Sequence, residues 1–311
     1  MQSNQTARQA VSRPFGREGD FAKLTSFVQN ISRLNPQEER HLHVGDLAWR
    51  IYRSAEFDAA QSVHLWEDKG TGALLGMGWY TPAHFGLDIV IHPEMLSSGL
   101  DKRILRWGEM LFRKVPFEQR GYAQLKVQVH DWDKRKEGML TDLGFRPDMF
   151  HYIWYQHDLT GKLPNPAPPQ GFELRLLEPG ELEYRAKLHN KSFFTEDVSD
   201  ESYTNLSQTT IYQQQAIDLL AVDENGKLAG FALGWLDFER KIGMFEPVGV
   251  KQKYRRLGLA NSLIISGMAR FKAAGMTAAQ VYTESPNLPA QRLYRSAGFE
   301  VVGRQFDWVK V

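Results

Sequence analysis

The most informative stretch of this sequence is residues 245–260, which read FEPVGVKQKYRRLGLA. The beginning of this stretch, together with the preceding Met244, predicts a strand over Met244–Val250, because the residues on both sides of Glu246 are apolar. Four cations follow within the six residues from Lys251 to Arg256. After Gly258, apolar residues recur on one face of a helix. The stretch therefore predicts a strand, a basic loop and the first turn of a helix in direct succession.

This succession favours binding of an anion. A helix N-terminus presents unpaired N–H groups and a partial positive charge. Gly258 has no Cβ, so an anion can approach its backbone closely. The cations add attraction for a polyphosphate. The loop lacks the G-K-[ST] ending of a nucleotide P-loop, which argues against a kinase or an ATPase, and a solvated basic turn is the plainer alternative.

The surrounding residues predict a mixed α/β layer. Strands are expected at 219–222, 228–235, 244–250, 279–283, 299–302 and 306–311. One helix is expected between Gly258 and Gly275, because glycine suits the position after a helix, and a short one over Pro289–Ser296. The order β-β-β-α-β-α-β-β places a βαβ crossover in the middle of the layer.

A proline-rich segment divides the sequence. Leu163–Pro169 holds four prolines in seven residues, which excludes a helix or a central strand and predicts a semi-rigid linker. Similar motifs around Gly76 and Gly230, and Gly-Phe pairs at Gly144 and Gly298, are both separated by 154 residues, which favours duplication. We expect a disordered N-terminus at 1–13, a first copy at 14–160, a linker at 161–171 and a second copy at 172–311.

The second copy resembles the GNAT N-acetyltransferase superfamily. Arg255-x-x-Gly258-x-Ala260 matches the Gln/Arg-x-x-Gly-x-Gly/Ala motif of that family's acetyl-CoA pyrophosphate site, and Asn287-x-x-Ala290-x-x-Leu293-Tyr294-x-x-x-Gly298-Phe299 is similar to its second signature. The resemblance implies two tandem GNAT-like acyl-CoA N-acyltransferase folds, each a mixed central β-sheet flanked by helices. This arrangement, two GNAT-like units with the intact motif in the second, resembles that of the mycothiol synthase-type tandem acetyltransferases.

The resemblance also implies a set of functional residues. Strand backbone before the loop would pair with the pantetheine of acetyl-CoA, and loop N–H groups would hold the pyrophosphate. Tyr294 matches the tyrosine that commonly protonates the CoA thiolate, although a core aromatic is the alternative reading. The residues expected to contact the cofactor are Val248, Gly249, Val250, Arg255, Arg256, Leu257, Gly258, Leu259, Ala260, Asn287 and Tyr294.

The general base has several candidates. Glu246 stands in the strand that would line the substrate cleft, where the family often has a glutamate, and its apolar neighbours would raise its pKa toward neutrality. A glutamate on a solvated strand face is the alternative. Asp237 and Glu239, on the loop after the preceding strand, are further candidates. His189 is expected at the surface rather than in a pocket.

The first copy is a weaker match for a cofactor site. Leu87–Pro93 takes the place of the strand that holds Glu246, but no basic run follows, and Glu94 and Asp101 flank Gly99. Negative charge there disfavours a pyrophosphate, and no tyrosine clearly matches Tyr294. We expect a degenerate copy that shapes the substrate cleft or stabilises its neighbour, with weak cofactor binding left open.

The amino-acid composition argues against several classes of function. The chain of 311 residues carries 38 Lys and Arg against 37 Asp and Glu, which argues against a nucleic-acid binder or electrostatic membrane docking. It has no cysteine, which excludes an acyl-thiol intermediate and thiolate metal ligands. His41-Leu42-His43 is a lone pair of histidines, expected on a helix or loop surface. The polar start and the absence of long apolar runs predict a cytoplasmic protein without a signal peptide.

The resemblance to the GNAT superfamily implies an N-acetyltransferase. It would transfer acetyl from acetyl-CoA to a primary amine of a small molecule by direct attack in the second copy, with Glu246 as base and Tyr294 as acid. No metal, nucleic acid or membrane partner is expected, and the protein would be a monomer or a homodimer. The alternatives are a CoA-binding sensor or regulatory module without turnover, and a ligand-binding interaction protein on the same fold.

Overall fold

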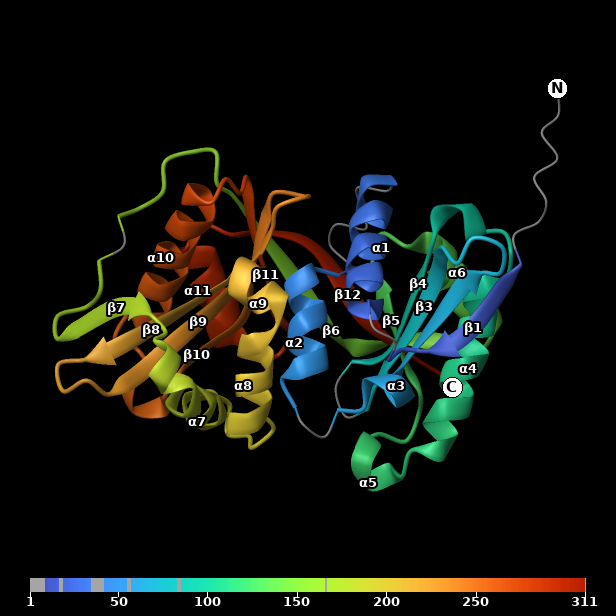
Figure 1. Cartoon of the computed structure of the whole chain (residues 1–311), viewed down its shortest axis with the longest axis horizontal. Coiled ribbons are helices and arrows are strands. Elements are labelled where there is room, and N and C mark those ends of the chain that lie inside the picture. Colours follow the sequence, from blue (N-terminus) through green and yellow to red (C-terminus); the bar gives the residue numbers. More distant parts are fainter. Residues whose placement is uncertain are drawn as a thin grey trace. The chain divides into compact units, whose positions relative to one another are not determined.

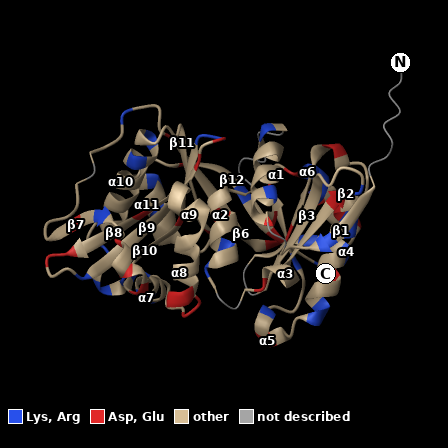
Figure 2. Cartoon of the chain, viewed as in Figure 1, with Lys and Arg blue, Asp and Glu red and all other residues tan. Residues whose placement is uncertain are grey.

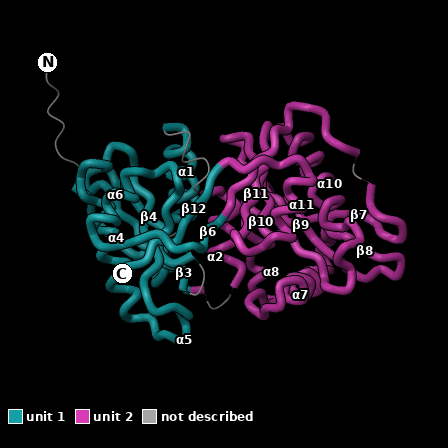
Figure 3. The backbone as a smooth tube through the Cα atoms, turned by 180° about the vertical axis from the view of Figure 1, so that it is seen from behind, with its two compact units in different colours: residues 1–41, 58–152, 303–311 teal, residues 42–57, 153–302 magenta. Residues whose placement is uncertain are grey.

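The computed structural model describes residues 9–16, 19–34, 42–54, 57–82, 85–165 and 167–310. The chain separates into two compact units, each assembled from segments that are distant in the sequence (Figure 3). Unit 1 comprises Met1–His41, Asp58–Tyr152 and Gly303–Val311. Unit 2 comprises Leu42–Phe57 and Ile153–Val302.

Unit 2 is built on a mixed sheet with the strand order β6-β11-β10-β9-β8-β7 (Figure 1). The strands are β6 (Phe145–Asp158, of which 153–158 belong to this unit), β7 (Phe172–Leu176), β8 (Ala216–Asp223), β9 (Leu228–Asp237), β10 (Ile242–Val250) and β11 (Ala278–Glu284). From β7 to β10 neighbouring strands are antiparallel, whereas β10 and β11 are parallel. The parallel pair is joined through helix α10 (Leu259–Ala273), which is the predicted βαβ crossover.

Apolar residues are buried on both faces of this sheet. Leu219 and Ala221 of β8 share a core with α10, whereas Leu220 and Val222 share another with Leu188 of α7 (Leu182–Phe193). Successive strand side chains point to opposite faces, so β8 needs apolar residues at consecutive positions. The other helices of unit 2 are α2 (Val44–Tyr52), α8 (Asp200–Gln208), α9 (Thr210–Gln215) and α11 (Leu288–Ser296).

Helix α10 lies very close to the sheet because glycines face aromatic rings. A Cβ on Gly243 of β10 would lie 2.4 Å from Phe271, and one on Gly267 of α10 would lie 2.4 Å from Phe245. The two rings pack with their centroids 4.6 Å apart. The helix that begins after Gly258 is therefore fixed against the strand that carries Glu246.

Most predicted elements of the second half are present. The strands predicted at 219–222, 228–235, 244–250 and 279–283 correspond to β8 to β11, and the predicted helix Pro289–Ser296 corresponds to α11. The two strands predicted at 299–302 and 306–311 are wrong: Gly303 continues the extended backbone, and one strand, β12 (Glu300–Lys310), spans both.

The sequence patterns do not predict β7, α8 or α9, and where α7 lies they indicate only a helix-like stretch around His189. Polar residues take part in the buried faces of α7 and α8, and Arg185, His189 and Ser202 are buried. The apolar periodicity that signals an amphipathic helix is therefore interrupted.

Unit 1 has a mixed sheet with the order β1-β2-β3-β4-β5-β12. Its further strands are β1 (Ala10–Pro14), β2 (Val63–Asp68), β3 (Leu74–Thr81), β4 (Gly86–Ile91) and β5 (Lys126–His130). β4 and β5 are parallel and the other neighbours are antiparallel. The helices are α1 (Asp20–Leu34), α3 (Ala59–Ser62), α4 (Leu100–Lys114), α5 (Phe117–Arg120) and α6 (Lys134–Asp142).

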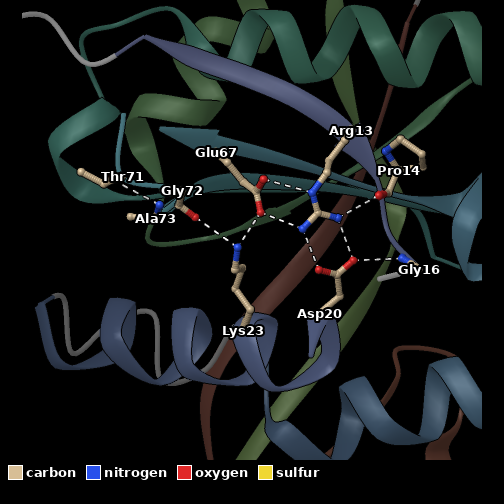
Figure 4. A network of polar contacts seen from close by, with 9 residues as sticks. All are labelled: Arg13, Pro14, Gly16, Asp20, Lys23, Glu67, Thr71, Gly72 and Ala73. Carbon is tan, nitrogen blue, oxygen red and sulfur yellow. Dashed lines mark hydrogen bonds and ion pairs between the residues drawn. The ribbon is translucent and has the colours of Figure 1, made fainter. Parts of the chain in front are cut away.

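An ion cluster fastens the edge strand β1 to α1 and β2 (Figure 4). Arg13 donates hydrogen bonds of 2.7 and 2.6 Å to Asp20 and of 3.0 and 2.7 Å to Glu67. Lys23 adds a 2.7 Å contact to Glu67. Such two-pronged Arg–carboxylate contacts fix orientation as well as adding energy. Residues 10–13 thus form a strand, which corrects that part of the predicted disordered N-terminus, whereas residues 1–8 lie outside the described residues.

The compact units differ from a simple division at the proline-rich segment. Leu42–Phe57 precedes that segment but belongs to unit 2, and Gly303–Val311 follows it but belongs to unit 1. The described residues of 161–171 form neither helix nor strand, and Pro166 lies outside the described residues. Ser262 Oγ of α10 donates to the carbonyl of Ala167 at 3.0 Å, so this segment is held against unit 2. The duplicated domains at 14–160 and 172–311 stay a prediction.

Positively and negatively charged residues occur along the chain in both units (Figure 2). Among the described helices, none has both the length and the apolar character needed to cross a membrane. Within the same described residues, no group of three or more His, Cys, Asp or Glu side chains is arranged to hold a metal ion.

Candidate functional site

β10 and β11 separate within the sheet of unit 2. The two strands pair over Ile242–Met244 and Ala278–Gln280, whereas β10 stays paired with β9 as far as Val250. A bulge between Phe245 and Val248 bends β10 where the separation begins. The described pairing with β11 does not reach Val248–Val250, so backbone groups of these residues on the β11 side can hydrogen-bond an extended ligand, although the Val250 carbonyl already accepts from Arg255.

The loop after β10 leads into the N-terminus of α10. It contains the short 3₁₀ helix η4 (Gln252–Tyr254), and it turns through left-handed backbone at Arg256 (φ 65°) and Gly258 (φ 85°). In the described structure, a Cβ on Gly258 would come near only Pro169 Cγ, at 3.7 Å. The first N–H groups of α10, from Leu259 onward, have no partner inside the helix. Open space, small residues and free N–H groups together make a cradle for a phosphate.

A cavity of about 730 Å³ joins this cradle to helix α11. Its volume suits a large cofactor such as a nucleotide thioester. Of the eleven expected cofactor contacts, all but Leu257 line it, and the Leu257 side chain is instead 48% exposed. The lining residues are Ser192, Phe193, Val248, Gly249, Val250, Tyr254, Arg255, Arg256, Gly258, Leu259, Ala260, Asn261, Asn287, Pro289, Ala290, Arg292, Leu293, Tyr294 and Ser296.

The cations of the loop divide into two kinds. Arg255 donates to the carbonyls of Val250 (3.1 Å) and Ser192 (2.8 Å), and Lys251 donates to the carbonyl of Leu228 (2.6 Å). These two side chains hold the loop in place. Lys253 lies over the ring of Tyr254, 4.4 Å from its centroid. Arg256 is exposed and, like Arg255, lines the cavity. The basic run thus combines side chains that anchor the loop with Arg256, which faces the cavity and can contact an anionic ligand.

The far wall of the cavity is helix α11. Asn287 caps this helix, because its Oδ1 accepts a 3.2 Å hydrogen bond from the N–H of Ala290. Tyr294 is 6% exposed and packs beside Tyr155 and Phe299, with ring centroids 5.6 and 6.1 Å away. Burial, followed by the charge of Glu246, raises the pKa of Tyr294 above its usual value. Tyr294 therefore keeps its proton at neutral pH and remains able to donate it.

Glu246 lies on the bulged part of β10, beside this cavity rather than in its lining. It is half-buried, and its backbone carbonyl accepts a 2.8 Å hydrogen bond from Nε1 of Trp235. Burial, reinforced by the negative charge of Asp46, raises the pKa of Glu246 to about 8. A carboxyl group with such a pKa can both take and release a proton near neutral pH.

Helix α2 supplies charged neighbours of Glu246 that the sequence patterns do not predict. Asp46, Arg50 and Arg53 all act on the carboxyl group of Glu246. Asp46 and Arg50 form a 3.6 Å ion pair in which both side chains are 5% exposed. These residues are about 200 positions away from Glu246 in the chain, so only the tertiary fold reveals the relationship.

The two other candidates for the base have different surroundings. Asp237 is fully buried and accepts a 2.7 Å hydrogen bond from Nε of Arg240. Burial opposes its ionisation, but Arg240 prevails and lowers the pKa of Asp237 below its usual value. Glu239 is exposed. A carboxylate held by an ion pair is a weak base, so Asp237 is a structural group.

Two histidines expected at the surface are buried, and both predictions are wrong. His43 caps α2 by accepting from the N–H of Gly45, and its Nε2 lies 3.1 Å from the carbonyl of Ile242. Burial lowers the pKa of His43 to about 3. His189 is 4% exposed between the rings of Trp49 and Phe193, and burial lowers its pKa to about 3 as well. His41 lies outside the described residues.

In the corresponding region of unit 1, a charged side chain of the protein itself lies at the helix N-terminus. β4 leads through the 3₁₀ helix η2 (Pro93–Met95) into α4, whose first turn contains Asp101. Asp101 is 3% exposed, accepts a 2.8 Å hydrogen bond from the N–H of Lys102 and is paired with Arg135. A buried carboxylate thus stands at the helix terminus where a phosphate would otherwise bind.

Known proteins resemble this chain in sequence and in structure. Residues 184–299 match the model of the acetyltransferase (GNAT) family. A mycothiol acetyltransferase of Pseudarthrobacter chlorophenolicus is 27% identical over 225 residues. That match covers 68% of this chain, and the chain spans 66% of the length of that relative.

Two solved structures share the fold over almost the whole chain. A GCN5-related N-acetyltransferase from Sphaerobacter thermophilus has a TM-score of 0.64 at 20% identity, covering 97% of this chain and 95% of its own. A tandem GNAT protein from the clavulanic acid biosynthesis pathway has a TM-score of 0.65 at 16% identity, covering 97% and 98%. The predicted fold class, a mixed α/β arrangement of the tandem GNAT type, is confirmed. The cavity, the phosphate cradle and helix α11 all lie within the matched residues, and the chain therefore carries an acetyltransferase domain of the GNAT family at residues 184–299.

Proposed function

We propose that this protein transfers the acetyl group of acetyl-CoA to a primary amine of a small molecule, by direct attack, in the cavity of unit 2. The observation that carries the proposal is the continuity of this cavity from the N-terminus of α10, along the open edge of β10, to Tyr294. A pyrophosphate, a pantetheine arm and a thioester need three such places in that order.

Binding of acetyl-CoA follows from the chain's own groups. The first N–H groups of α10 and the guanidinium of Arg256 would hold the pyrophosphate. The open backbone of Val248–Val250 would pair with the amides of pantetheine, as an added strand pairs with a sheet edge. Asn287 would serve mainly by capping α11 at the cavity wall.

The reaction needs a base, a site for the oxyanion and an acid. Glu246 would accept a proton from the substrate ammonium, and the amine nitrogen would then attack the thioester carbon. Backbone N–H groups beside the β10 bulge would stabilise the oxyanion. As the C–N bond forms and the C–S bond breaks, Tyr294 would give its proton to the departing sulfur, and the second proton lost by the attacking nitrogen would restore the Tyr294 hydroxyl. The chain has no cysteine, so acetyl transfer would not pass through an enzyme thioester.

The acceptor is proposed only as a class. Relatives at 24–29% identity are named mycothiol acetyltransferases, which makes amines related to mycothiol the first to test. Calorimetry with acetyl-CoA, followed by a thiol-release assay over a panel of small amines, tests the proposal. Release of CoA together with acetylated amine supports transfer. Binding of acetyl-CoA without release for any amine would instead support a CoA sensor, and absence of binding would contradict both.

A further inference from the structure

The proline-rich segment Leu163–Pro169 follows helix α10 from its last turn back to its first (Figure 1). The ammonium group of Lys272, in the last turn, donates a 3.1 Å hydrogen bond to the carbonyl of Thr160, shortly before the segment. In the first turn, the hydroxyl group of Ser262 donates a 3.0 Å hydrogen bond to the carbonyl of Ala167. A proline-rich chain rises about 3.1 Å per residue against about 1.5 Å for an α-helix, so this short segment is long enough to follow the helix.

The end of this segment reaches the phosphate cradle. A Cβ atom placed on Gly258, which precedes α10, would lie 3.7 Å from Cγ of Pro169. The backbone at this place is fixed, because the carbonyl of Pro169 accepts a 3.1 Å hydrogen bond from the N–H of Phe172 at the start of β7. The half-buried ring of Pro169 therefore forms an apolar surface directly beside the cradle.

A second ring stands in the loop that leads to Gly258. Tyr254 lines the cavity, but the path proposed for the pyrophosphate and the pantetheine arm gives it no role. Its hydroxyl group donates a 2.6 Å hydrogen bond to Asp223, and its ring packs against that of Phe172 with centroids 5.7 Å apart. Phe172 thus holds Pro169 through its N–H group and Tyr254 through its ring.

The chemical structure of acetyl-CoA calls for a further contact near the cradle. Its pyrophosphate joins the pantetheine arm to an adenosine that carries a 3′-phosphate. With the pyrophosphate at Gly258 and the pantetheine arm along β10, the adenosine continues beyond the cradle. Every purine has a flat face that packs well against the rings of other groups. The exposed ammonium group of Lys253 lies 4.4 Å from the centre of the Tyr254 ring, which adds a cation for the 3′-phosphate.

We infer that the proline-rich segment completes the cofactor site, and that Pro169 and Tyr254 hold the adenosine of acetyl-CoA. The contacts with α10 and β7 place the Pro169 ring beside the cradle, and the hydrogen bond to Asp223 orients the Tyr254 ring. The segment between the two halves of the sequence is then a binding element as well as a linker. The inference rests on the proposed binding of acetyl-CoA in the cavity of unit 2.

Fragments of the cofactor locate the effect of each substitution. Isothermal titration calorimetry of the full-length protein would use acetyl-CoA, adenosine 3′,5′-bisphosphate and acetyl-pantetheine, which lacks the nucleotide. Pro169→Ala should weaken binding of acetyl-CoA about fivefold and Tyr254→Ala about tenfold, because each removes ring surface that covers the adenosine. The bisphosphate should lose affinity by the same factors, whereas the affinity for acetyl-pantetheine should stay within about twofold of the wild-type value.

Pro168→Ala is the matched control for Pro169→Ala. Pro168 belongs to the same segment and is exposed, so its substitution gives the backbone similar freedom without removing the ring beside Gly258. This control should leave all three affinities unchanged. Proton NOEs between the adenine of the bisphosphate and ¹³C-labelled proline rings provide a second readout. They should be present in the wild type and in Pro168→Ala, and absent in Pro169→Ala.

The possible outcomes distinguish this inference from the proposed function. If the wild-type protein binds neither acetyl-CoA nor the bisphosphate, the proposed function is wrong. If it binds acetyl-CoA, but folded Pro169→Ala and Tyr254→Ala behave like Pro168→Ala and no proline–adenine NOE is seen, the inference is overturned while the function remains. Equal weakening of acetyl-pantetheine and the bisphosphate would also overturn it, because the substitutions would then distort the cradle as a whole. If Tyr254→Ala fails to fold, the comparison of Pro169→Ala with Pro168→Ala decides the question.

Discussion

Lys136 of α6 donates a 3.1 Å hydrogen bond to the backbone carbonyl of Ile89 on β4. Its ammonium also lies 3.3 Å from Asp133, and the Lys136 side chain is 5% exposed. β4 and β5 pair at Leu87 and Val127, near the start of β4, so Ile89 lies on the part of β4 that follows this pairing. In unit 2 the equivalent region of β10 is open, whereas in unit 1 the chain's own ammonium group occupies it.

This contact predicts a single acetyl-CoA site for each chain. Lys136 binds the Ile89 carbonyl at the strand edge of unit 1, and the Asp101 carboxylate stands at the helix terminus, so the chain's own side chains compete there with pantetheine and repel a pyrophosphate. Calorimetry should show one site, and Gly258→Glu should abolish it because a carboxylate would stand where the phosphate binds. A second equivalent bound, or binding that survives in a folded Gly258→Glu variant, would contradict the prediction.

Tyr294→Phe should lower kcat by about 10²-fold or more with little change in KM. The hydroxyl is needed to protonate the leaving thiolate, whereas the ring alone maintains the packing with Tyr155 and Phe299. Steady-state and single-turnover kinetics with acetyl-CoA and an accepted amine provide the measurement. An unchanged rate of the chemical step would rule out Tyr294 as the acid.

The pH dependence of the wild-type protein should reflect Glu246. Because its pKa is raised to about 8, activity that requires ionised Glu246 should rise as the pH increases through about 8. The same shift has a consequence for stability. Between the unfolded value of about 4.5 and the folded value of about 8, the folded state binds the extra proton, so stability falls as the pH rises.

Glu246→Gln tests both effects. The substitution should remove the rise in activity with increasing pH that depends on ionised Glu246. The melting temperature of Glu246→Gln relative to that of the wild type should rise steadily between pH 5 and about 8. Thermal melts across this range provide the measurement. A difference in melting temperature that does not depend on pH would contradict the raised pKa of Glu246.

His43 should make unfolding easier in acid. Burial lowers its folded pKa to about 3, against about 6.5 in the unfolded chain, so the unfolded state binds an extra proton as the pH falls below 6.5. His43→Asn keeps a side chain able to cap α2 but removes this titration. The free energy of unfolding, measured with urea at pH 6, 5 and 4, should therefore fall less steeply with decreasing pH in His43→Asn than in the wild type. The difference between the two slopes should be up to about 1.4 kcal/mol per pH unit. Equal slopes in both proteins would mean that His43 is not buried as a neutral group.

Local chemistry made the residues that line the cavity of unit 2 predictable. Strand, cation run and Gly258 are adjacent in sequence, and a loop between a strand and a helix has few possible geometries. The positions of Asn287 and Tyr294 could be predicted because the second signature lies on and just before one short helix, which lines the same cavity as the loop. Leu257 was the exception, since a position inside the motif does not decide which way its side chain points.

Tertiary contacts could not be predicted in the same way. Asp46 reaches Glu246 only because α2 packs within unit 2, across a long separation in the chain. His43 and His189 are polar and gave no apolar signal, yet hydrogen bonds and aromatic rings compensate their burial. The continuation of β12 through Gly303 likewise depends on partner strands rather than on local preference.

Acetyl transfer in the cavity of unit 2 can be tested by incubating the protein with acetyl-CoA and a panel of small primary amines, and by quantifying free CoA and acetylated amine together by mass spectrometry. We predict equal amounts of the two products for at least one amine with the wild-type protein, and loss of both with a folded Gly258→Glu variant. Acetyl-CoA that binds in the cavity but is not consumed with any amine, or turnover that persists in Gly258→Glu, would contradict the claim.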